Sequence, residues 1–117
     1  KLASTTYESI GSISNKYWDE VYENKMKKVS ICFKKIKSLG CIGYEYVDIA
    51  IGNRDFIILS KLYPWDHIPG ILIVREAGGY DIHFDNKNRY QHNLEKDNLV
   101  VTGSKKMQKK IMELIKE

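Results

Sequence analysis

Asp66 carries the clearest chemical signal in the sequence. It follows a short apolar run at residues 55–60 and opens an apolar stretch, expected to be a helix, that reaches Ala77. A carboxylate there commonly caps the helix, because it accepts a bond from an unpaired backbone N–H and favours the positive helix end. The carboxyl edge of an α/β sheet is also where ligands bind, and carboxylate oxygens suit Mg²⁺. Residue type and position agree with both roles and do not choose between them.

Histidine and cysteine spacing points to no further chemical site. His67, His83 and His92 have no spacing typical of a metal site, so we expect structural or exposed roles for them. Cys32 and Cys41 match no zinc or redox motif, which indicates reduced thiols in a cytoplasmic protein. The sequence also lacks a nucleophile elbow, a P-loop and a Gly-x-Gly-x-x-Gly turn. No residue of the chain is therefore assigned as a catalytic acid, base or nucleophile.

Periodicity and glycine positions predict the elements that hold Asp66. Gly52 and Gly78 follow apolar helical patterns, as helix C-caps do. Continuous apolar runs at 55–60 and 98–102 indicate strands that are covered on both faces. Helices that alternate with such strands predict an α/β fold with a layered sheet. The predicted elements are a first dozen residues that form either a linker or a strand separated from its neighbours, helix 15–27 capped by Ser14, strand 29–37, helix 42–52, strand 55–60, helix 66–77 with Pro69 in its first turn, strand 80–84, a polar loop 85–97, strand 98–102 and helix 104–116.

Composition restricts the chain to an ordinary globular domain. Its 117 residues are 43% hydrophobic and 29% charged, which suffices for one core and excludes a disordered or disulfide-scaffolded chain. The net charge of +4 is mild, and the lysine-rich stretches lack the pattern of a nucleic-acid surface. No apolar run approaches the ~20 residues of a membrane span, and no signal peptide opens the sequence. We therefore expect a cytoplasmic protein without nucleic-acid or membrane partners and, since Lys1 stands where Met would, a piece of a longer protein.

A longer motif surrounds Asp66. Residues 65–79 read Trp-Asp, then a largely apolar helix, then Glu-Ala-Gly-Gly, and this run resembles the C-terminal signature of the inositol monophosphatase family. The resemblance covers residues 29–117 well and residues 1–28 poorly. Its flanking matches are Ser38-Leu39-Gly40, Ala50-Ile51-Gly52, Asp55-Phe56 and Val100-Val101 followed by a last helix.

That family resemblance implies a fold and a division of the chain. The implied fold is the C-terminal half of the inositol monophosphatase-like (sugar phosphatase) fold, a layered αβα domain with a small mixed sheet. Residues 1–28 would form a junction segment and first helix, and residues 29–117 the C-terminal domain. The family's N-terminal half, with a metal-binding Glu and an Asp-Pro-(Ile/Leu)-Asp-Gly-Thr/Ser motif, has no counterpart in the sequence.

The resemblance also implies roles for particular residues. Asp66 corresponds to the aspartate that binds a catalytic Mg²⁺, and Gly40 and Cys41 correspond to residues that line the substrate side of the pocket. Family members commonly carry Ser or Thr where Cys41 stands, so a hydroxyl contact is replaced by a weaker thiol. Leu59 replaces the Glu that binds the ring hydroxyls in inositol phosphatases, which argues against inositol specificity. Glu45 is a further candidate for substrate contact, although a solvated helix carboxylate is the commoner case.

The expected function follows from these roles. The resemblance implies a phosphoric monoester hydrolase that uses Mg²⁺ and acts on a small phosphate monoester. The N-terminal domain of the same protein would be the partner that completes the site, a homodimer is compatible with the family, and the chain by itself would be inactive. Two alternatives stay open: a non-catalytic α/β binding or interaction module, and a phosphatase for a sugar or nucleotide phosphate.

Overall fold

The structure, a computed structural model, describes residues 9–14, 18–33, 35–36, 41–60, 64–84, 89–90 and 98–116 of the chain. For residues 35 and 64–66 it describes the backbone and not the side chains. The predicted polar loop 85–97 thus lies almost entirely outside the described residues. The elements, in order, are β1 (Ile10–Ile13), α2 (Glu20–Ser30), β2 (Lys35–Ile36), α3 (Ile42–Ile51), β3 (Phe56–Leu59), α4 (Pro64–Glu76), β4 (Tyr80–Ile82), β5 (Leu99–Thr102) and α5 (Lys105–Lys116).

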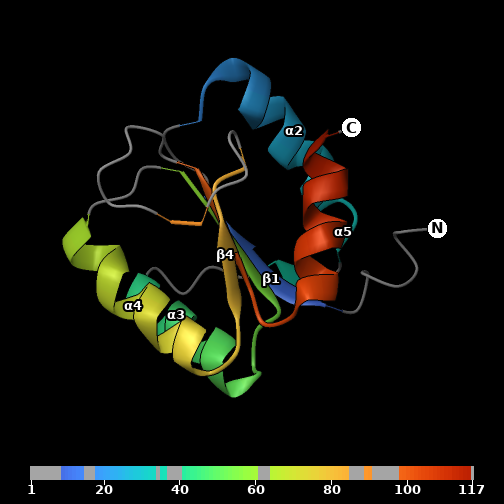
Figure 1. Cartoon of the computed structure of the whole chain (residues 1–117). Helices are drawn as coiled ribbons and strands as arrows, with labels where there is room; N and C mark the ends of the chain where they lie inside the picture. The colour runs from blue at the N-terminus through green and yellow to red at the C-terminus, as the bar shows by residue number, and fades with distance from the viewer. Residues whose placement is uncertain are drawn as a thin grey trace.

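One mixed sheet organises the described residues (Figure 1). Its strand order is β2-β1-β3-β5-β4, with five strands. β1 runs parallel to β2 and β3, while β5 runs antiparallel to β3 and β4. β1, β3 and β4 therefore point the same way and end at the same edge of the sheet.

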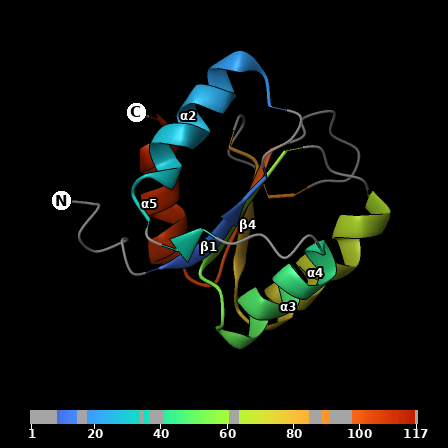
Figure 2. The same cartoon turned by 180° about the vertical axis from the view of Figure 1, so that it is seen from behind.

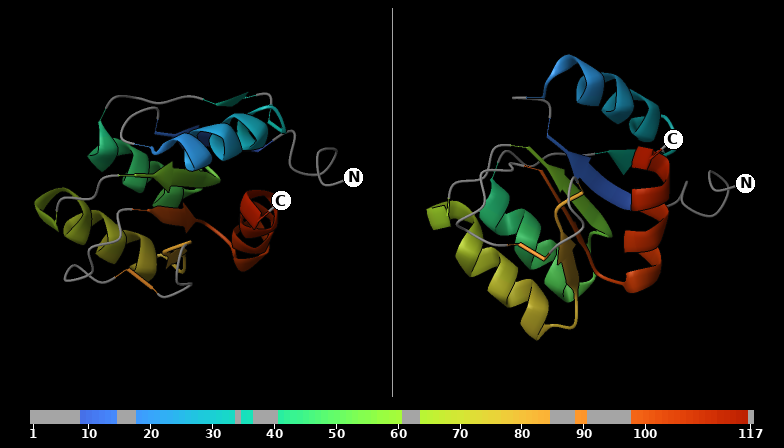
Figure 3. Two further views of the ribbon diagram at one scale, coloured as in Figure 1. Left: turned by 90° about the horizontal axis from the view of Figure 1, so that it is seen from above. Right: turned by 45° about the horizontal axis from the view of Figure 1, so that its top comes forward.

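Helices cover both faces of the sheet. α3 and α4 lie on one face and α2 and α5 on the other, as Figure 3 shows. Neighbouring side chains of a strand point to opposite faces, so Ile57 packs in the cluster under α3 and α4 and Ile58 in the cluster under α2 and α5. This alternation confirms the layered αβα arrangement with a small mixed sheet, and the continuous burial of β3 and β5 confirms that both are covered strands.

β1 lies at the inner side of the sheet, between β2 and β3 (Figure 2). Of the first dozen residues, the structure describes 9–12, and residues 10–12 belong to a strand that is paired on both sides and is not separated from its neighbours. Asp55 holds β1 in place, because its N–H donates to the Ile10 carbonyl at 2.7 Å and its carboxylate accepts from the Ile10 N–H at 2.8 Å. Gly11 lies so close to the Phe56 ring that a Cβ would come within 2.1 Å of it. The division predicted at residue 28 falls within α2.

The N-terminal helix starts later than predicted. α2 spans Glu20–Ser30 instead of residues 15–27, and its N-cap is Asp19, whose carboxylate accepts from the Tyr22 N–H at 2.8 Å. Ser14 is not the cap. The strand predicted at 29–37 starts later, because α2 continues to Ser30; within the described residues of that stretch, the strand is the pair Lys35–Ile36. Basic residues in its last turn favour that longer helix, since they lie at the negative helix end.

The remaining predicted elements agree closely with the structure. α3 ends at Gly52, which has a φ of 86°, as the C-cap prediction requires. β4 is shorter than the predicted strand 80–84, and α5 starts one residue after the predicted Ser104 because the Ser104 hydroxyl caps it, accepting from the Met107 N–H at 3.1 Å. None of the described helices combines the length and the apolar character that a bilayer crossing requires.

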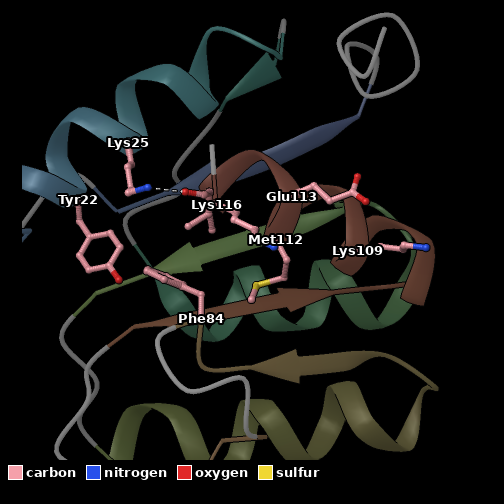
Figure 4. Close-up of a pocket in the computed structure, with 8 residues that line it drawn as sticks. Tyr22, Lys25, Phe84, Lys109, Met112, Glu113 and Lys116 are labelled. Carbon is pink, nitrogen blue, oxygen red and sulfur yellow. Dashed lines mark hydrogen bonds between the residues drawn. The ribbon is translucent and has the colours of Figure 1, made fainter.

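α2 and α5 are joined near the C-terminal end of α5. Lys25 Nζ donates to the Ile115 carbonyl at 2.9 Å (Figure 4). This bond satisfies one of the carbonyls that a helix leaves unpaired at its C-terminus. Beside it, a hollow of about 390 Å³ opens between the two helices, with Phe84 and Met112 among the side chains that line it.

The packing of α4 on α3 depends on Gly70. A Cβ at this position would lie 2.1 Å from the Tyr46 ring, which is fully buried. We expect Gly70→Ala to lower the free energy of unfolding by about 2 kcal/mol, because the ring has no free space to move into. Gly43→Ala is the matched control in the partner helix, since a Cβ there meets nothing within 4 Å. Urea unfolding of the two variants measures the difference, and equal stabilities would contradict this packing.

Candidate functional site

Polar side chains gather at the carboxyl edge of the parallel strands. Ser14 follows β1 and Ser60 follows β3, and their hydroxyl oxygens lie 3.1 Å apart. His83 follows β4 and is fully buried, with Nδ1 2.8 Å from the Asn98 carbonyl oxygen. Buried polar groups are normally hydrogen-bonded, and these contacts follow that rule. Polar interactions therefore fix the ends of the strands at this edge of the sheet.

Two helices begin at this same edge. α3 and α4 each follow a strand that ends there, and both run back across one face of the sheet, side by side (Figure 2). The Tyr46 hydroxyl of α3 and His67 Nδ1 of α4 lie 2.6 Å apart, and both residues are buried. This contact fixes the first turn of α4 against α3. The positive ends of two helices therefore lie next to each other, which favours an anion.

Asp66 is the third residue of α4, in that first turn. α4 begins at Pro64, two residues before the predicted start, since proline suits the first helical position. Asp66 is thus not the N-cap, so of the two roles that the sequence left open the structure does not bear out the capping role. Pro69 is the sixth residue and not part of the first turn, so it has no N–H to give to the carbonyl of Trp65. The side chain of Asp66 lies outside the described residues.

The other predicted site residues have different surroundings. Glu45 of α3 is only 4% exposed, so the alternative of a solvated helix carboxylate was wrong. Cys41 is the exposed N-cap residue of α3, and its thiol makes no capping bond. Leu59 ends β3, opposite Leu99, and is half-buried. Gly40 lies outside the described residues.

Histidine and cysteine roles agree with the sequence where they are described. His67 and His83 are buried and bonded to neighbours, as structural histidines are, whereas His92 lies outside the described residues. Cys32 and Cys41 are both free thiols. The pairing of Tyr46 with His67 and of Ser14 with Ser60 was missed. In the sequence, only their places at the ends or starts of elements could have indicated these contacts.

The described side chains alone do not complete a metal centre. Among them, no three His, Cys, Asp or Glu residues gather closely enough to hold an ion. Two carboxylates on this face of the sheet near the edge are Glu45 and, by the position of its backbone, Asp66. Mg²⁺ requires several oxygen ligands and gives up its bound water molecules reluctantly. The chemistry of this donor set therefore fits a part of a magnesium site, to which further oxygens must be added.

The end of the 65–79 motif has a structural role. Arg75 donates from Nε and Nη2 to the two carboxylate oxygens of Asp81 at 2.8 and 2.7 Å. That hydrogen bonding, with the charge of Asp81, raises the pKa of Arg75 above its usual value. Gly78 has a φ of 86°, and a Cβ on Gly79 would lie 2.8 Å from the Thr102 carbonyl oxygen. These contacts hold the far end of α4 to β4 and β5.

The bond between Tyr46 and His67 can be tested by removing one oxygen. We expect Tyr46→Phe to lower the free energy of unfolding by about 1–2 kcal/mol, because His67 Nδ1 then loses its partner in the interior. Tyr44→Phe is the control two residues away, on an exposed side chain, and should change stability by less than about 0.5 kcal/mol. Thermal unfolding of both variants measures this, and indistinguishable midpoints would refute the stabilising role.

The chain resembles curated phosphatases in sequence. It is 33% identical over 90 residues to the fructose-1,6-bisphosphatase/inositol-1-monophosphatase of Thermococcus kodakarensis, covering 72% of this chain and 34% of that protein. It is also 33% identical over 54 residues to the protein of the same name from Thermotoga maritima, covering 46% of this chain and 21% of that protein. The chain thus spans about a third or less of these relatives.

Solved structures share the fold. An inositol monophosphatase from Zymomonas mobilis matches 94% of this chain with a TM-score of 0.82 at 16% identity, and the match covers 43% of that protein. An inositol monophosphatase II from Staphylococcus aureus matches 93% with a TM-score of 0.79 at 18% identity, covering 41% of that protein. The sequence profile of the inositol monophosphatase family itself matches residues 2–117. With nearly its whole length matched, the chain belongs to the inositol monophosphatase family.

Proposed function

We propose that this chain forms part of a magnesium-dependent phosphatase for small phosphate monoesters and supplies Asp66 as a metal ligand. The observation that carries the proposal is the place of Asp66: it lies in the first turn of α4, beside the start of α3, in a chain of the inositol monophosphatase family. Relatives named as fructose-1,6-bisphosphatase and inositol-1-monophosphatase support phosphatase chemistry.

The two adjacent helix ends suit a phosphate ester. Phosphoryl transfer depends mainly on positioning and on stabilising negative charge, and helix N-termini provide positive potential at this edge without a mobile side chain. The bond between Tyr46 and His67 fixes the position of these two helix ends relative to each other. A phosphate bound there would therefore be oriented by elements that are already packed.

Asp66 would hold Mg²⁺ together with oxygen donors from outside this chain. A bound magnesium ion neutralises phosphate charge and lowers the pKa of a coordinated water. The positive end of α4 would favour the ionised form of a carboxylate in its first turn, which is the form that binds a cation. Association with the family's other half, as an N-terminal domain of the same protein, is part of this proposal because one carboxylate holds the ion poorly.

Substrate contacts are proposed for the residues around the start of α3. Gly40 and Cys41 would line the pocket, and Glu45, one turn further along, would approach it from α3. Leu59 ends β3 at the same edge, and its side chain has no hydrogen-bonding atom. By the family resemblance, Leu59 stands where inositol phosphatases carry a Glu that binds the hydroxyls of the inositol ring, so a sugar or nucleotide phosphate is the favoured substrate and inositol phosphate the less favoured one.

Removal of the Asp66 charge tests the metal role. In a protein that joins this chain to the family's remaining half, we expect Asp66→Asn to reduce kcat/KM for phosphate esters by orders of magnitude, because a neutral amide binds Mg²⁺ weakly. Glu76→Gln, at the exposed far end of the same helix, should leave activity unchanged. We expect the 117-residue chain alone to release no phosphate. Turnover by that chain that is lost in Asp66→Asn, or near-normal activity of Asp66→Asn in the longer protein, would refute the proposal.

A panel of substrates tests the role of Leu59. Steady-state rates for inositol phosphate, sugar phosphates and nucleotide monophosphates should rank inositol phosphate below the others, because Leu59 accepts no bond from ring hydroxyls. Leu59→Glu should reduce the difference in rate between inositol phosphate and the other two classes of ester. A preference for inositol phosphate in the unmodified protein would contradict this assignment, and absence of turnover with every ester would favour a non-catalytic binding module.

A further inference from the structure

A second hollow lies at the opposite edge of the sheet from Asp66. It has a volume of about 440 Å³ and opens between the start of β4 and the start of α5. Tyr80, the first residue of β4, pairs with Thr102, the last residue of β5, at this amino edge. Cavities of this size accommodate small molecules. Because β3 and β4 run in the same direction, the length of the sheet separates this hollow from the candidate phosphatase site.

Positive side chains dominate the lining of this hollow. Arg75, Arg89 and Lys105 contribute three cations, against the single carboxylate of Asp81. That carboxylate is already engaged, since it accepts both bonds from Arg75 and a third from the Tyr90 N–H at 2.8 Å, and its side chain is 1% exposed. Within the described residues, neither Arg89 nor Lys105 has an ion-pair partner. The hollow therefore presents an excess of positive charge.

Two of these cations are held in defined places. The bidentate bond to Asp81 fixes the plane of the Arg75 guanidinium, whose Nη1 takes no part in that pair. Lys105 Nζ lies 5.9 Å from the centre of the Tyr80 ring, within the range of a cation–π contact. Lys105 also opens α5, so the positive end of a 12-residue helix adds to the potential, and Gln108 of the same turn contributes a polar side chain.

We propose that this basic hollow binds the phosphate group of a small molecule. Guanidinium groups and helix N-termini suit the tetrahedral oxygens of phosphate, which carry more charge than a single carboxylate. The site lies at the amino edge, so a ligand here would be additional to the substrate proposed at the carboxyl edge. Binding at this site does not depend on Asp66 or on a metal ion.

The hollow between α2 and α5 is a useful comparison. It also has lysines in its lining, but Lys25 donates to the Ile115 carbonyl, and Lys109 shares the lining with the carboxylate of Glu113 (Figure 4). It lies near the C-terminal end of α5, where the helix dipole favours cations over anions. Lys109 is therefore a control residue that stands on the same helix as Lys105 and carries the same charge.

Direct binding to the 117-residue chain tests the proposal. Calorimetric or NMR titration at low ionic strength with inorganic phosphate, pyrophosphate and adenosine monophosphate should give saturable binding of at least one probe, and salt should weaken it. The inorganic and organic probes distinguish a free phosphate from a phosphate ester. Lys105→Gln and Arg89→Gln should each weaken binding about tenfold or more, whereas Lys109→Gln should leave it unchanged.

The three side chains to be changed are exposed, so thermal unfolding should show that the variants fold. Saturable binding that both substitutions weaken and Lys109→Gln does not would support the site. No binding of any probe would overturn it. Equal affinity in the Lys105→Gln and Lys109→Gln proteins would also overturn it, because the phosphate would then be held by net charge alone.

Discussion

The close approach of α3 and α4 is the constraint on which the candidate site depends. Gly70 has no side chain, so the Tyr46 ring fits directly against α4, and its hydroxyl reaches His67. That contact places the first turn of α4, and with it Asp66, beside the start of α3. A wider spacing of the helices would separate their positive ends and weaken the potential that a phosphate would experience.

Sequence reasoning predicted the elements whose signals are local and strong. Gly52 ends α3, and the continuous apolar runs of β3 and β5 are buried strands, because glycine conformation and two-sided burial leave direct marks in the sequence. The sequence left β1 undecided, because its four residues Ile-Gly-Ser-Ile are too few to show a repeating hydrophobic pattern. Its place depends on Asp55 and Phe56, which lie 45 positions away, and such pairing is not visible locally.

The candidate site was predictable only as far as its motif extends. The 65–79 run located Asp66 and the turn at Gly78-Gly79, yet a shift of two residues in the start of α4 removed the capping role. The burial of Glu45 could not be derived, because periodicity alone did not show that this side of α3 is covered. The basic hollow was also missed, since Arg75, Arg89 and Lys105 meet only through the pairing of β4 with β5.

The position of β1 has a consequence for biosynthesis. A chain is made from its N-terminus, so β1 is synthesised before β2 and β3, the two strands that flank it in the sheet. Parallel pairing over such a separation is slow, because a long loop must close before any contact compensates for the lost entropy. Until β1 inserts, β3 presents an apolar, unpaired strand edge, a known aggregation hazard. Folding chains of this protein therefore expose that edge from the synthesis of β3 until β1 has paired with it.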